Sequence, residues 1–412
     1  MKIILLMLIL SLSACSRNID MEKDRIEVEE PRKTEAKGEE PLEIIEKDEI
    51  EGLIQGMSLE EKIGQLFIFG LNGDKIDQNA IDLIEKHHIG GFVFFRENIK
   101  NPEQTVEFLN KLKEINKNKP IPLFLSIDEE GGRVSRLPSE FPKMPGAKVL
   151  GDINNQDLSF QYGKILAMRI KSLGFNMDFA PVMDINSNPE NPVIGDRAFG
   201  NTIDIVVNNS LETMKGINSE NIISVIKHFP GHGDTNMDSH IDIPIIDKDL
   251  KEINDLELIP FKEAIENGVD SIMIGHILFP ALDNKPATLS TKIINDLLRK
   301  ELDFNGVVIS DDLNMGAIVR NYTMEEAVIE FLNAGGDIAL ICHGGEEEYK
   351  IFDIIKREVE NENISEEEID QKVYRIIELK KKYNIEDNII ENLNLEIINQ
   401  ETKIFLDKIK EF

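Results

Sequence analysis

The sequence predicts an α/β fold, a single (β/α)8 barrel of the triosephosphate isomerase type. From Met57 onward, short apolar runs bounded by Gly, Asn, Asp or Pro alternate with longer stretches of helical period. Eight such strand-then-helix units occupy about 325 of the 412 residues. One barrel typically takes ~250 residues and can extend beyond 400, so the length fits a single barrel with generous loops.

The strands and helices of this barrel follow from the pattern in chain order. The apolar runs expected as strands are 66–70, 91–95, 123–128, 177–184, 224–228, 271–276, 307–311 and 337–342. The stretches expected as helices are 80–87, 102–116, 160–173, 203–217, 258–267, 291–302 and 324–333. The segment 384–412 is expected to form one or two terminal helices rather than a further domain.

The position of the polar residues favours a barrel over an open sheet. Several apolar runs end in polar side chains: Asp128, Asp184, Lys227-His228, His276 and Asp311-Asp312. Barrels place their active sites at the carboxyl ends of the strands, whereas an open sheet binds its ligand at one switch point. Neither glycine-rich nucleotide-binding pattern, G-x-G-x-x-G or G-x-x-x-x-G-K-[ST], is present. Whether Asp184 or His276 touches a substrate stays open at this point.

Composition excludes some classes of protein. The chain has 46 Lys and Arg against 77 Asp and Glu, a net charge of −31. Binding to a nucleic-acid backbone needs a cluster of cations, so nucleic acid is not expected as a partner. Only two cysteines occur, Cys15 and Cys342, which excludes a framework of disulfides. No cofactor is expected.

The N-terminus has the features of an export signal. Lys2 precedes eight consecutive apolar residues, 3–10, which suit a signal peptide but are too few to span a bilayer. Leu12-Ser13-Ala14-Cys15 then resembles a bacterial lipobox. We therefore expect a signal peptide over 1–14 and a lipid on Cys15 that anchors an extracytoplasmic protein to a membrane. An ordinary secretory signal with an incidental cysteine is the alternative.

An acidic segment follows the predicted lipid. Residues 16–51 contain 14 acidic and 7 basic residues and no sustained apolar period. The composition predicts a flexible tether over 15–51, with a weak helical alternative over 44–53. The barrel domain is then 52–412, and it carries most of the negative charge.

The segment 227–240 holds three of the seven histidines. A metal site is one interpretation, because His228, His232, Asp238 and His240 are all competent ligands. One proline and two glycines within the segment, however, argue against the helix that would bring histidines four apart onto one metal ion.

The interpretation we prefer concerns Asp238 and His240. In an extended loop, side chains two residues apart lie on the same side, so the carboxylate can hold an imidazole N–H. This contact fixes the tautomer and raises the imidazole pKa, which gives a group able to donate and accept a proton near neutral pH.

Two further segments carry polar residues suited to chemistry. The run 306–310 ends in Asp311 and Asp312, of which one can cap a helix while the other faces the pocket as a nucleophile, base or metal ligand. The segment 128–136 combines three acids, two glycines and two arginines, which suits the binding of a polyol or, alternatively, a surface turn held by salt bridges. Arg197 lies on another glycine-flanked loop.

Together these segments resemble glycoside hydrolase family 3, and specifically its β-N-acetylhexosaminidase branch. The resemblance runs from about residue 57 to about residue 383 and rests on four motifs in the order found in the family. These are Asp-x-Glu-Gly-Gly-Arg-Val-x-Arg at 128–136, Ile-Gly-Asp-Arg at 194–197, Lys-His-Phe-Pro-Gly-His-Gly-Asp-Thr through Asp-Ser-His at 227–240, and Ser-Asp-Asp-Leu at 310–313.

The resemblance implies a role for each matching position. Asp311 falls on the catalytic nucleophile, His240 on the acid/base, and Asp238 on its partner in a dyad. The positions that bind sugar in the family are Asp128, Arg136, Arg197, Lys227 and His228. The expected activity is retaining, exo-acting hydrolysis of terminal non-reducing β-linked N-acetylglucosamine, from muropeptides or amino-sugar glycans. A β-N-acetylglucosaminide phosphorylase, a catalytically inactive glycan-binding lipoprotein and a metal-dependent hydrolase are the alternatives.

Overall fold

A computed structural model describes residues 42–239, 242–343 and 349–412. Residues Glu46–Phe412 form one compact unit. The predicted signal peptide, Cys15 and most of the acidic segment lie outside the described residues, as does His240. In the part of the chain that the structure covers, no helix combines the length and the apolar character needed to cross a bilayer.

The strands all run parallel and form two sheets. Their bounds are β1 Phe67–Gly70, β2 Gly91–Phe94, β3 Phe124–Ile127, β4 Met177–Asp178, β5 Ile223–Ser224, β6 Ile226–Phe229, β7 Ser271–Ile274, β8 Val307–Ser310 and β9 Ala339–Ile341. One sheet has the order β5-β4-β3-β2-β1-β9, and the other has the order β6-β7-β8. The parallel pairing of the predicted α/β fold is therefore confirmed.

Isolated bridges link the two sheets. Ile309 of β8 pairs with Ile338, just before β9, and Val182, beyond β4, pairs with Lys227 of β6. The predicted strand 224–228 is divided between β5 and β6, because the chain changes its pairing partner from β4 to β7 at Val225. The described residues thus show two ladders joined by single bridges rather than one continuous closed ladder.

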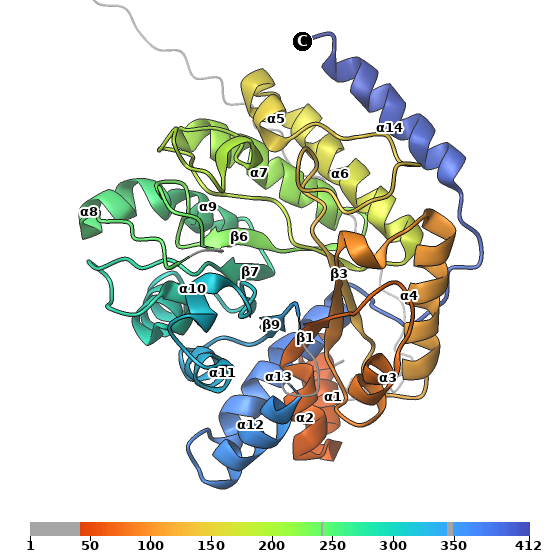
Figure 1. Ribbon diagram of the computed structural model, residues 1–412, viewed down its shortest axis with the longest axis vertical. Helices are drawn as coiled ribbons and strands as arrows, with labels where there is room; N and C mark the ends of the chain where they lie inside the picture. Colours follow the sequence, from red (N-terminus) through yellow and green to blue (C-terminus); the bar gives the residue numbers. More distant parts are fainter. Residues whose placement is uncertain (1–41, 240–241, 344–348) are drawn as a thin grey trace, which may run out of the picture. The chain divides into compact units, whose positions relative to one another are not determined.

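The helices lie around the strands (Figure 1). The longer ones are α1 Leu42–Gly56, α4 Pro102–Asn116, α6 Gln156–Leu173, α7 Ile203–Asn218, α11 Met324–Asn333, α12 Lys350–Glu360, α13 Glu366–Lys382 and α14 Leu395–Ile409. The shorter ones are α2 Leu59–Gln65, α3 Gln78–Glu85, α5 Ala147–Ile153, α8 Leu250–Glu252, α9 Ile259–Glu266 and α10 Gly316–Val319. Two π-helical segments are η3 Ile253–Glu257 and η5 Lys292–Glu301, and three 3-10 turns are η1 Arg96–Asn98, η2 Gly195–Arg197 and η4 Ala287–Leu289.

The predicted elements agree with these bounds in most places. The helices expected at 102–116 and 324–333 match α4 and α11 residue for residue. The strand expected at 177–184 is wrong beyond Asp178, and one reason is that Pro181 has no N–H to donate to a ladder. The helical alternative near residues 44–53 is confirmed by α1, so the expected tether does not extend to residue 51.

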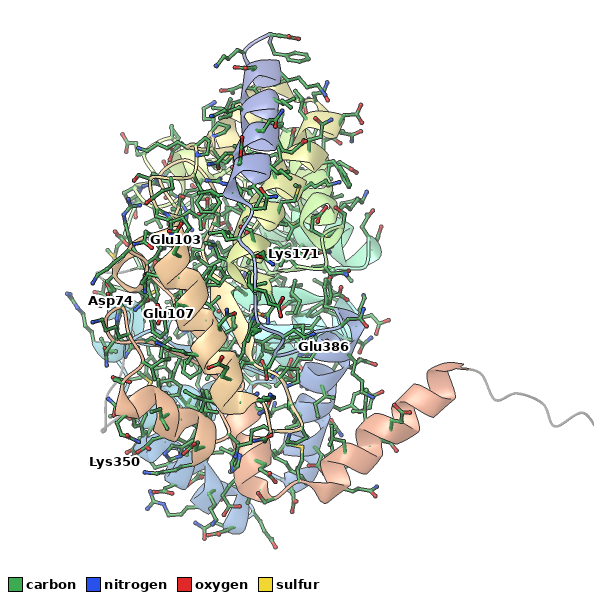
Figure 2. All side chains as sticks on the ribbon, turned by 90° about the vertical axis from the view of Figure 1, so that its right-hand side faces the viewer. Asp74, Glu103, Glu107, Lys171, Lys350 and Glu386 are labelled. Carbon is green, nitrogen blue, oxygen red and sulfur yellow. The ribbon has the colours of Figure 1, made fainter. Side chains whose placement is uncertain are left out.

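The core is formed by the strands and the inner faces of the helices. Strands β2, β3, β7 and β8 are buried at every position, as expected for parallel strands covered on both faces. Charged residues gather on the outside instead, where Glu103 and Glu107 stand exposed on α4 (Figure 2). Part of the negative charge is therefore carried by the surface of the compact unit Glu46–Phe412.

One buried ion pair network joins both sheets to the helices. Asp337, just before β9, is fully buried and accepts from Val308 N–H at 2.7 Å and from Arg299 Nη2 at 2.5 Å. Its other oxygen accepts from Arg375 Nε at 2.9 Å and Nη2 at 2.7 Å. Burial acts to raise the pKa of Asp337, but the two guanidinium groups hold it below its ordinary value.

Replacing Asp337 with Asn should therefore destabilise the fold strongly. The change leaves Arg299 and Arg375 without their charge partner, and breaking a buried pair in this way costs about 3–5 kcal/mol. Urea unfolding followed by circular dichroism measures the change. Glu107→Gln, which removes the exposed pair with Lys111, is the control and should leave the midpoint unchanged. Equal midpoints for Asp337→Asn and the wild type would contradict the role of this network.

Candidate active site

A pocket of about 390 Å³ opens at the carboxyl ends of the strands. Its lining includes six of the residues predicted from the sequence: Asp128, Arg136, Arg197, Lys227, His228 and Asp311. Asp238 is half-buried and is not part of the lining, and His240 lies outside the described residues. The structure therefore brings together residues 183 positions apart in the chain, as the barrel prediction requires.

Lys227, at the centre of β6, organises one side of the pocket. Its Nζ lies 2.7 Å from Asp128 Oδ1 and 2.6 Å from Glu130 Oε1, and its side chain is only 3% exposed. Burial acts to lower the pKa of Lys227, but the two carboxylates raise it overall. The ammonium is therefore charged at any working pH and fixes both acids.

Glu130 holds a second cation at the pocket. Arg197, on the turn η2, donates from Nε and Nη2 to the two oxygens of Glu130, each at 2.8 Å. Burial acts to raise the pKa of Glu130, but Arg197 and Lys227 bring it far below its ordinary value. Among the three acids of this segment only Asp128 was predicted as a site residue, and Glu130 was missed as the link between Lys227 and Arg197.

The third acid, Glu129, points away from the pocket. It is fully buried, accepts from the Ser135 hydroxyl and pairs with Arg169 at 3.3 Å. The alternative of a salt-bridged surface turn is therefore wrong for this segment, because both Glu129 and Glu130 are buried in ion pairs. A further ion pair, between Arg133 and Asp196 at 2.8 Å, connects this loop to the loop of Arg197.

Asp184 positions two histidines. It is fully buried, lies 2.7 Å from His228 Nδ1, and accepts from the backbone N–H of His228 at 3.2 Å and of His232 at 2.7 Å. Asp184 does not line the pocket, but His228 does. Asp184 therefore affects the pocket by holding the His228 ring in place. The two imidazoles meet edge to face with centroids 5.7 Å apart.

His232 is held as a neutral imidazole. Its Nδ1 lies 3.0 Å from Thr235 Oγ1, and its Nε2 lies 3.4 Å from Ser239 Oγ. Burial, together with the neighbouring imidazole of His228, lowers the pKa of His232 to about 4. A group this acidic cannot serve as a proton donor near neutral pH, so His232 supports the loop rather than carrying out proton transfer.

Asp311 follows β8 and is suited to act as an anion. Its N–H donates to Ile274 O at 2.9 Å, and its Oδ1 accepts from Asp312 N–H at 2.8 Å. Burial acts to raise the pKa of Asp311, but the imidazoles of His276 and His228 outweigh it and leave the pKa below its ordinary value. The carboxyl is therefore ionised at working pH while facing the pocket.

Asp312 has a different environment from its neighbour. Its Oδ1 accepts from the N–H groups of Asn314 and Cys342, each at 3.0 Å, and burial raises its pKa. It therefore ties the turn after β8 to the end of β9. The expected helix cap is wrong, because the next helix, α10, begins at Gly316 with Met315 as its N-cap and no side-chain cap bond. His276 is fully buried outside the lining and donates from Nε2 to the Asp312 carbonyl at 2.8 Å, so both His276 and Asp184 have positioning roles.

Several lining residues had no signal in the sequence analysis. Phe95 stacks on His343 with centroids 5.4 Å apart, and the guanidinium of Arg136 lies 5.5 Å from the Phe95 ring. Met273, Met315 and Cys342 add sulfur atoms to the wall. Phe95 and Cys342 are the last residues of the predicted strands 91–95 and 337–342 and directly follow the observed β2 and β9, so their positions at the strand ends could have identified them.

The loop that leads to His240 is attached to the pocket at several points. Asn191 Nδ2 donates to His232 O at 2.8 Å, and Ala317 N–H donates to Ser239 O at 3.0 Å. Ser239 itself lines the pocket. Among the residues that the structure describes, no cluster of three His, Cys, Asp or Glu side chains has the arrangement of a metal site.

Comparison with known proteins identifies the family of this chain. Residues 58–379 match the model of the glycosyl hydrolase family 3 N-terminal domain. The chain is 36% identical over 336 residues to beta-hexosaminidase A of Pseudoalteromonas piscicida, which covers 73% of this chain but only 54% of that protein. It is also 36% identical over 271 residues to the beta-hexosaminidase of Nitrosomonas eutropha, covering 64% of this chain and 76% of that protein.

Among solved structures, the chain is similar to a glycoside hydrolase family 3 beta-N-acetylglucosaminidase from Paenibacillus sp. FPU-7. The two share 37% of their residues with a TM-score of 0.80, over 85% of this chain and 69% of that one. The chain belongs to glycosyl hydrolase family 3, which confirms the resemblance drawn from the four motifs. It spans about half the length of the Pseudoalteromonas relative.

The lowered pKa of His232 predicts a pH-dependent stability. Between its folded value of about 4 and its ordinary value near 6.5, the unfolded state binds a proton that the folded state does not. Stability contributed by neutral His232 is therefore lost as the pH falls. From pH 7 to pH 5, the free energy of unfolding should fall by about 2 kcal/mol more in the wild type than in His232→Gln. Urea unfolding at each pH tests this, and parallel slopes would refute it.

Proposed function

We propose that this protein is a retaining, exo-acting β-N-acetylhexosaminidase that removes terminal non-reducing β-linked N-acetylglucosamine. The observation that carries the proposal is Asp311, an ionised carboxylate at the end of β8 that faces a pocket lined by Lys227, Arg197 and Arg136. An anion of this kind is a competent nucleophile toward an anomeric carbon, and the opposite wall supplies hydrogen-bond donors for sugar oxygens. The printed names of the relatives support the same activity.

The first half of the proposed reaction forms a covalent intermediate. An oxygen of Asp311 attacks the anomeric carbon, and the glycosidic bond breaks as protonated His240 gives its proton to the departing oxygen. In the second half, neutral His240 takes a proton from water, the water attacks the same carbon, and the ester to Asp311 is released. Two inversions leave the product with the β configuration. Asp238 orients His240 in this scheme.

The position of His240 next to Ser239 supports its role. Ser239 lines the pocket, and its carbonyl accepts from the N–H of Ala317, which lies five residues after Asp312 in the chain. His232, the other histidine of this loop, has a pKa of about 4 and is unsuited to the task.

The sugar-binding residues have donors and acceptors to spare. The Nε of Arg136 is buried at the pocket and makes no hydrogen bond to the described part of the chain. Asp128 is bound by Lys227 and by Arg136 at 3.4 Å, so it is held as an acceptor for hydroxyl groups. A polyol fits such a wall, because each hydroxyl both donates and accepts.

The same proposal includes a complete (β/α)8 barrel. β5 and β6 follow one another along a single strand position, so the strands occupy eight positions. The bridges Ile309–Ile338 and Val182–Lys227 lie where the two sheets adjoin and support closure of the ring. Four pocket residues lie directly at the carboxyl ends of strands, where barrel enzymes place their active sites: Phe95, Asp128, Asp311 and Cys342.

We also propose that the protein works outside the cytoplasm as a lipid-anchored enzyme. The lipobox-like Leu12-Ser13-Ala14-Cys15 supports this location, and with it a substrate among cell-wall fragments or amino-sugar glycans. Replacing Cys15 with Ala should move the expressed protein from the membrane fraction to the soluble fraction. Metabolic labelling with a fatty acid should mark the wild type alone, and label on the Cys15→Ala variant would contradict lipidation there.

The nucleophile is tested with Asp311→Gly. Turnover of an aryl β-N-acetylglucosaminide should fall at least about 10³-fold, because the covalent route is removed. Azide, a small anion that fits the vacated space, should restore turnover and yield the α-glycosyl azide. Asp296→Gly, an exposed aspartate on η5, is the matched control and should retain activity.

Two results would overturn this assignment. A near-normal rate in Asp311→Gly would exclude Asp311 as the nucleophile, and a β-configured azide product would exclude the retaining route. Wild-type turnover with and without inorganic phosphate completes the test. Free N-acetylglucosamine in both cases is expected, whereas sugar 1-phosphate would identify a phosphorylase instead.

A further inference from the structure

We propose that Lys248 is a positioning residue for acid catalysis: its ion pairs with Asp234 and Glu257 fix the loop that carries Asp238 and His240. The proposal rests on the proposed function, since it needs His240 to protonate the leaving group. Its consequence is that removal of Lys248 slows reactions that require protonation and spares those that do not.

The contacts of Lys248 are short and shielded from solvent. Its Nζ lies 2.8 Å from Asp234 Oδ2 and 2.5 Å from Glu257 Oε1. The side chain of Lys248 is 15% exposed, and that of Glu257 is 3% exposed. Burial acts to lower the pKa of Lys248, but both carboxylates raise it overall. The ammonium is therefore permanently charged, and its ion pairs are stronger than those at an open surface.

The pair with Asp234 joins the two arms of the dyad loop. Asp234 lies on the arm that leaves β6, and Lys248 lies on the arm that leads into α8, so the ion pair joins the two residues that flank the segment 235–247, of which residues 240 and 241 lie outside the described part of the chain. Asp238 lies within this loop, as does His240 in sequence. Met237, at 42% exposed, lies at a part of the loop open to solvent. An ion pair across its ends restricts the conformations available to such a segment.

Glu257 connects the loop to the body of the protein. It ends the π-helical segment η3, and Gly231, with φ of +133°, lies so close that a Cβ there would meet Glu257 Cβ at 2.9 Å. The second carboxylate oxygen of Glu257 is buried with no hydrogen-bond partner in the described residues. Lys248 therefore stabilises the buried carboxylate of Glu257 and also holds Asp234 in place through its second ion pair.

The sharpest test variant is Lys248→Met with Glu257→Gln. The single variant Lys248→Met leaves a buried carboxylate without a cation, which destabilises the protein for reasons unrelated to catalysis. The double variant removes the connection without leaving that charge unpaired, so it is more suitable for kinetics. Lys248→Arg keeps the charge and should retain function. Lys251→Met is the matched control, because Lys251 pairs with Asp255 on the neighbouring surface and is 82% exposed.

The measurement is kcat/KM for two β-N-acetylglucosaminides with different leaving groups. 2,4-Dinitrophenolate leaves without a proton, whereas the sugar alcohol released from chitobiose needs one. The double variant should lose about tenfold on chitobiose, or about 1.4 kcal/mol of transition-state stabilisation, and less than about twofold on the dinitrophenyl substrate. Lys248→Arg and Lys251→Met should stay within about twofold of the wild type on both. Thermal unfolding confirms that each variant is folded.

Equal losses on the two substrates, or no loss on either, would overturn the role of Lys248. His240→Ala separates this failure from a failure of the proposed function. If kcat/KM depends steeply on the leaving group in His240→Ala but not in the double variant, the positioning role of Lys248 is refuted and the acid role of His240 stands. If kcat/KM does not depend on the leaving group in His240→Ala, the acid role of His240 is refuted, and with it the role of Lys248.

Discussion

The buried ammonium of Lys227 is the interaction on which the rest of the pocket depends. It contacts Asp128 and Glu130 at once, and Glu130 in turn holds both donors of Arg197. The loops that follow β3 and β4 are therefore aligned by one charge within β6. Removing this buried cation would leave Asp128 and Glu130 unpaired. The same contacts therefore determine both the position and the charge of these pocket residues. A site of this kind is ordered before any substrate arrives.

Two adjacent carboxyl groups show how far environment decides function. Asp311 and Asp312 have the same side chain and both are largely withdrawn from solvent, yet the pKa of Asp311 is lowered and that of Asp312 is raised. Burial acts in the same direction on both residues. The difference comes from the imidazoles near Asp311, which favour its charge, whereas the backbone donors to Asp312 do not fully offset burial. The charged form is therefore favoured at Asp311 and disfavoured at Asp312.

The sequence was sufficient to predict the strands, most helices and the residues at the strand ends, because burial imposes a regular apolar pattern. It was insufficient for Glu130, whose partner Lys227 is 97 positions away and becomes a neighbour only in the folded chain. The helices α2 and α13 went unpredicted although each begins with a capping box, at Ser58 and Ser365. That signal is local and was available. The early end of β4 followed from the missing N–H of Pro181, which the apolar pattern alone concealed.

Cys342 gives the pocket a chemical property of its own. Burial raises the pKa of this thiol well above its ordinary value, and the nearby carboxylates act in the same direction. Thiolate is the form that reacts with oxidants and disulfides, so a thiol kept protonated beside the nucleophile is inert. An exposed unpaired cysteine invites mixed disulfides in an oxidising compartment, whereas a buried, protonated thiol such as Cys342 can remain in the pocket wall unmodified.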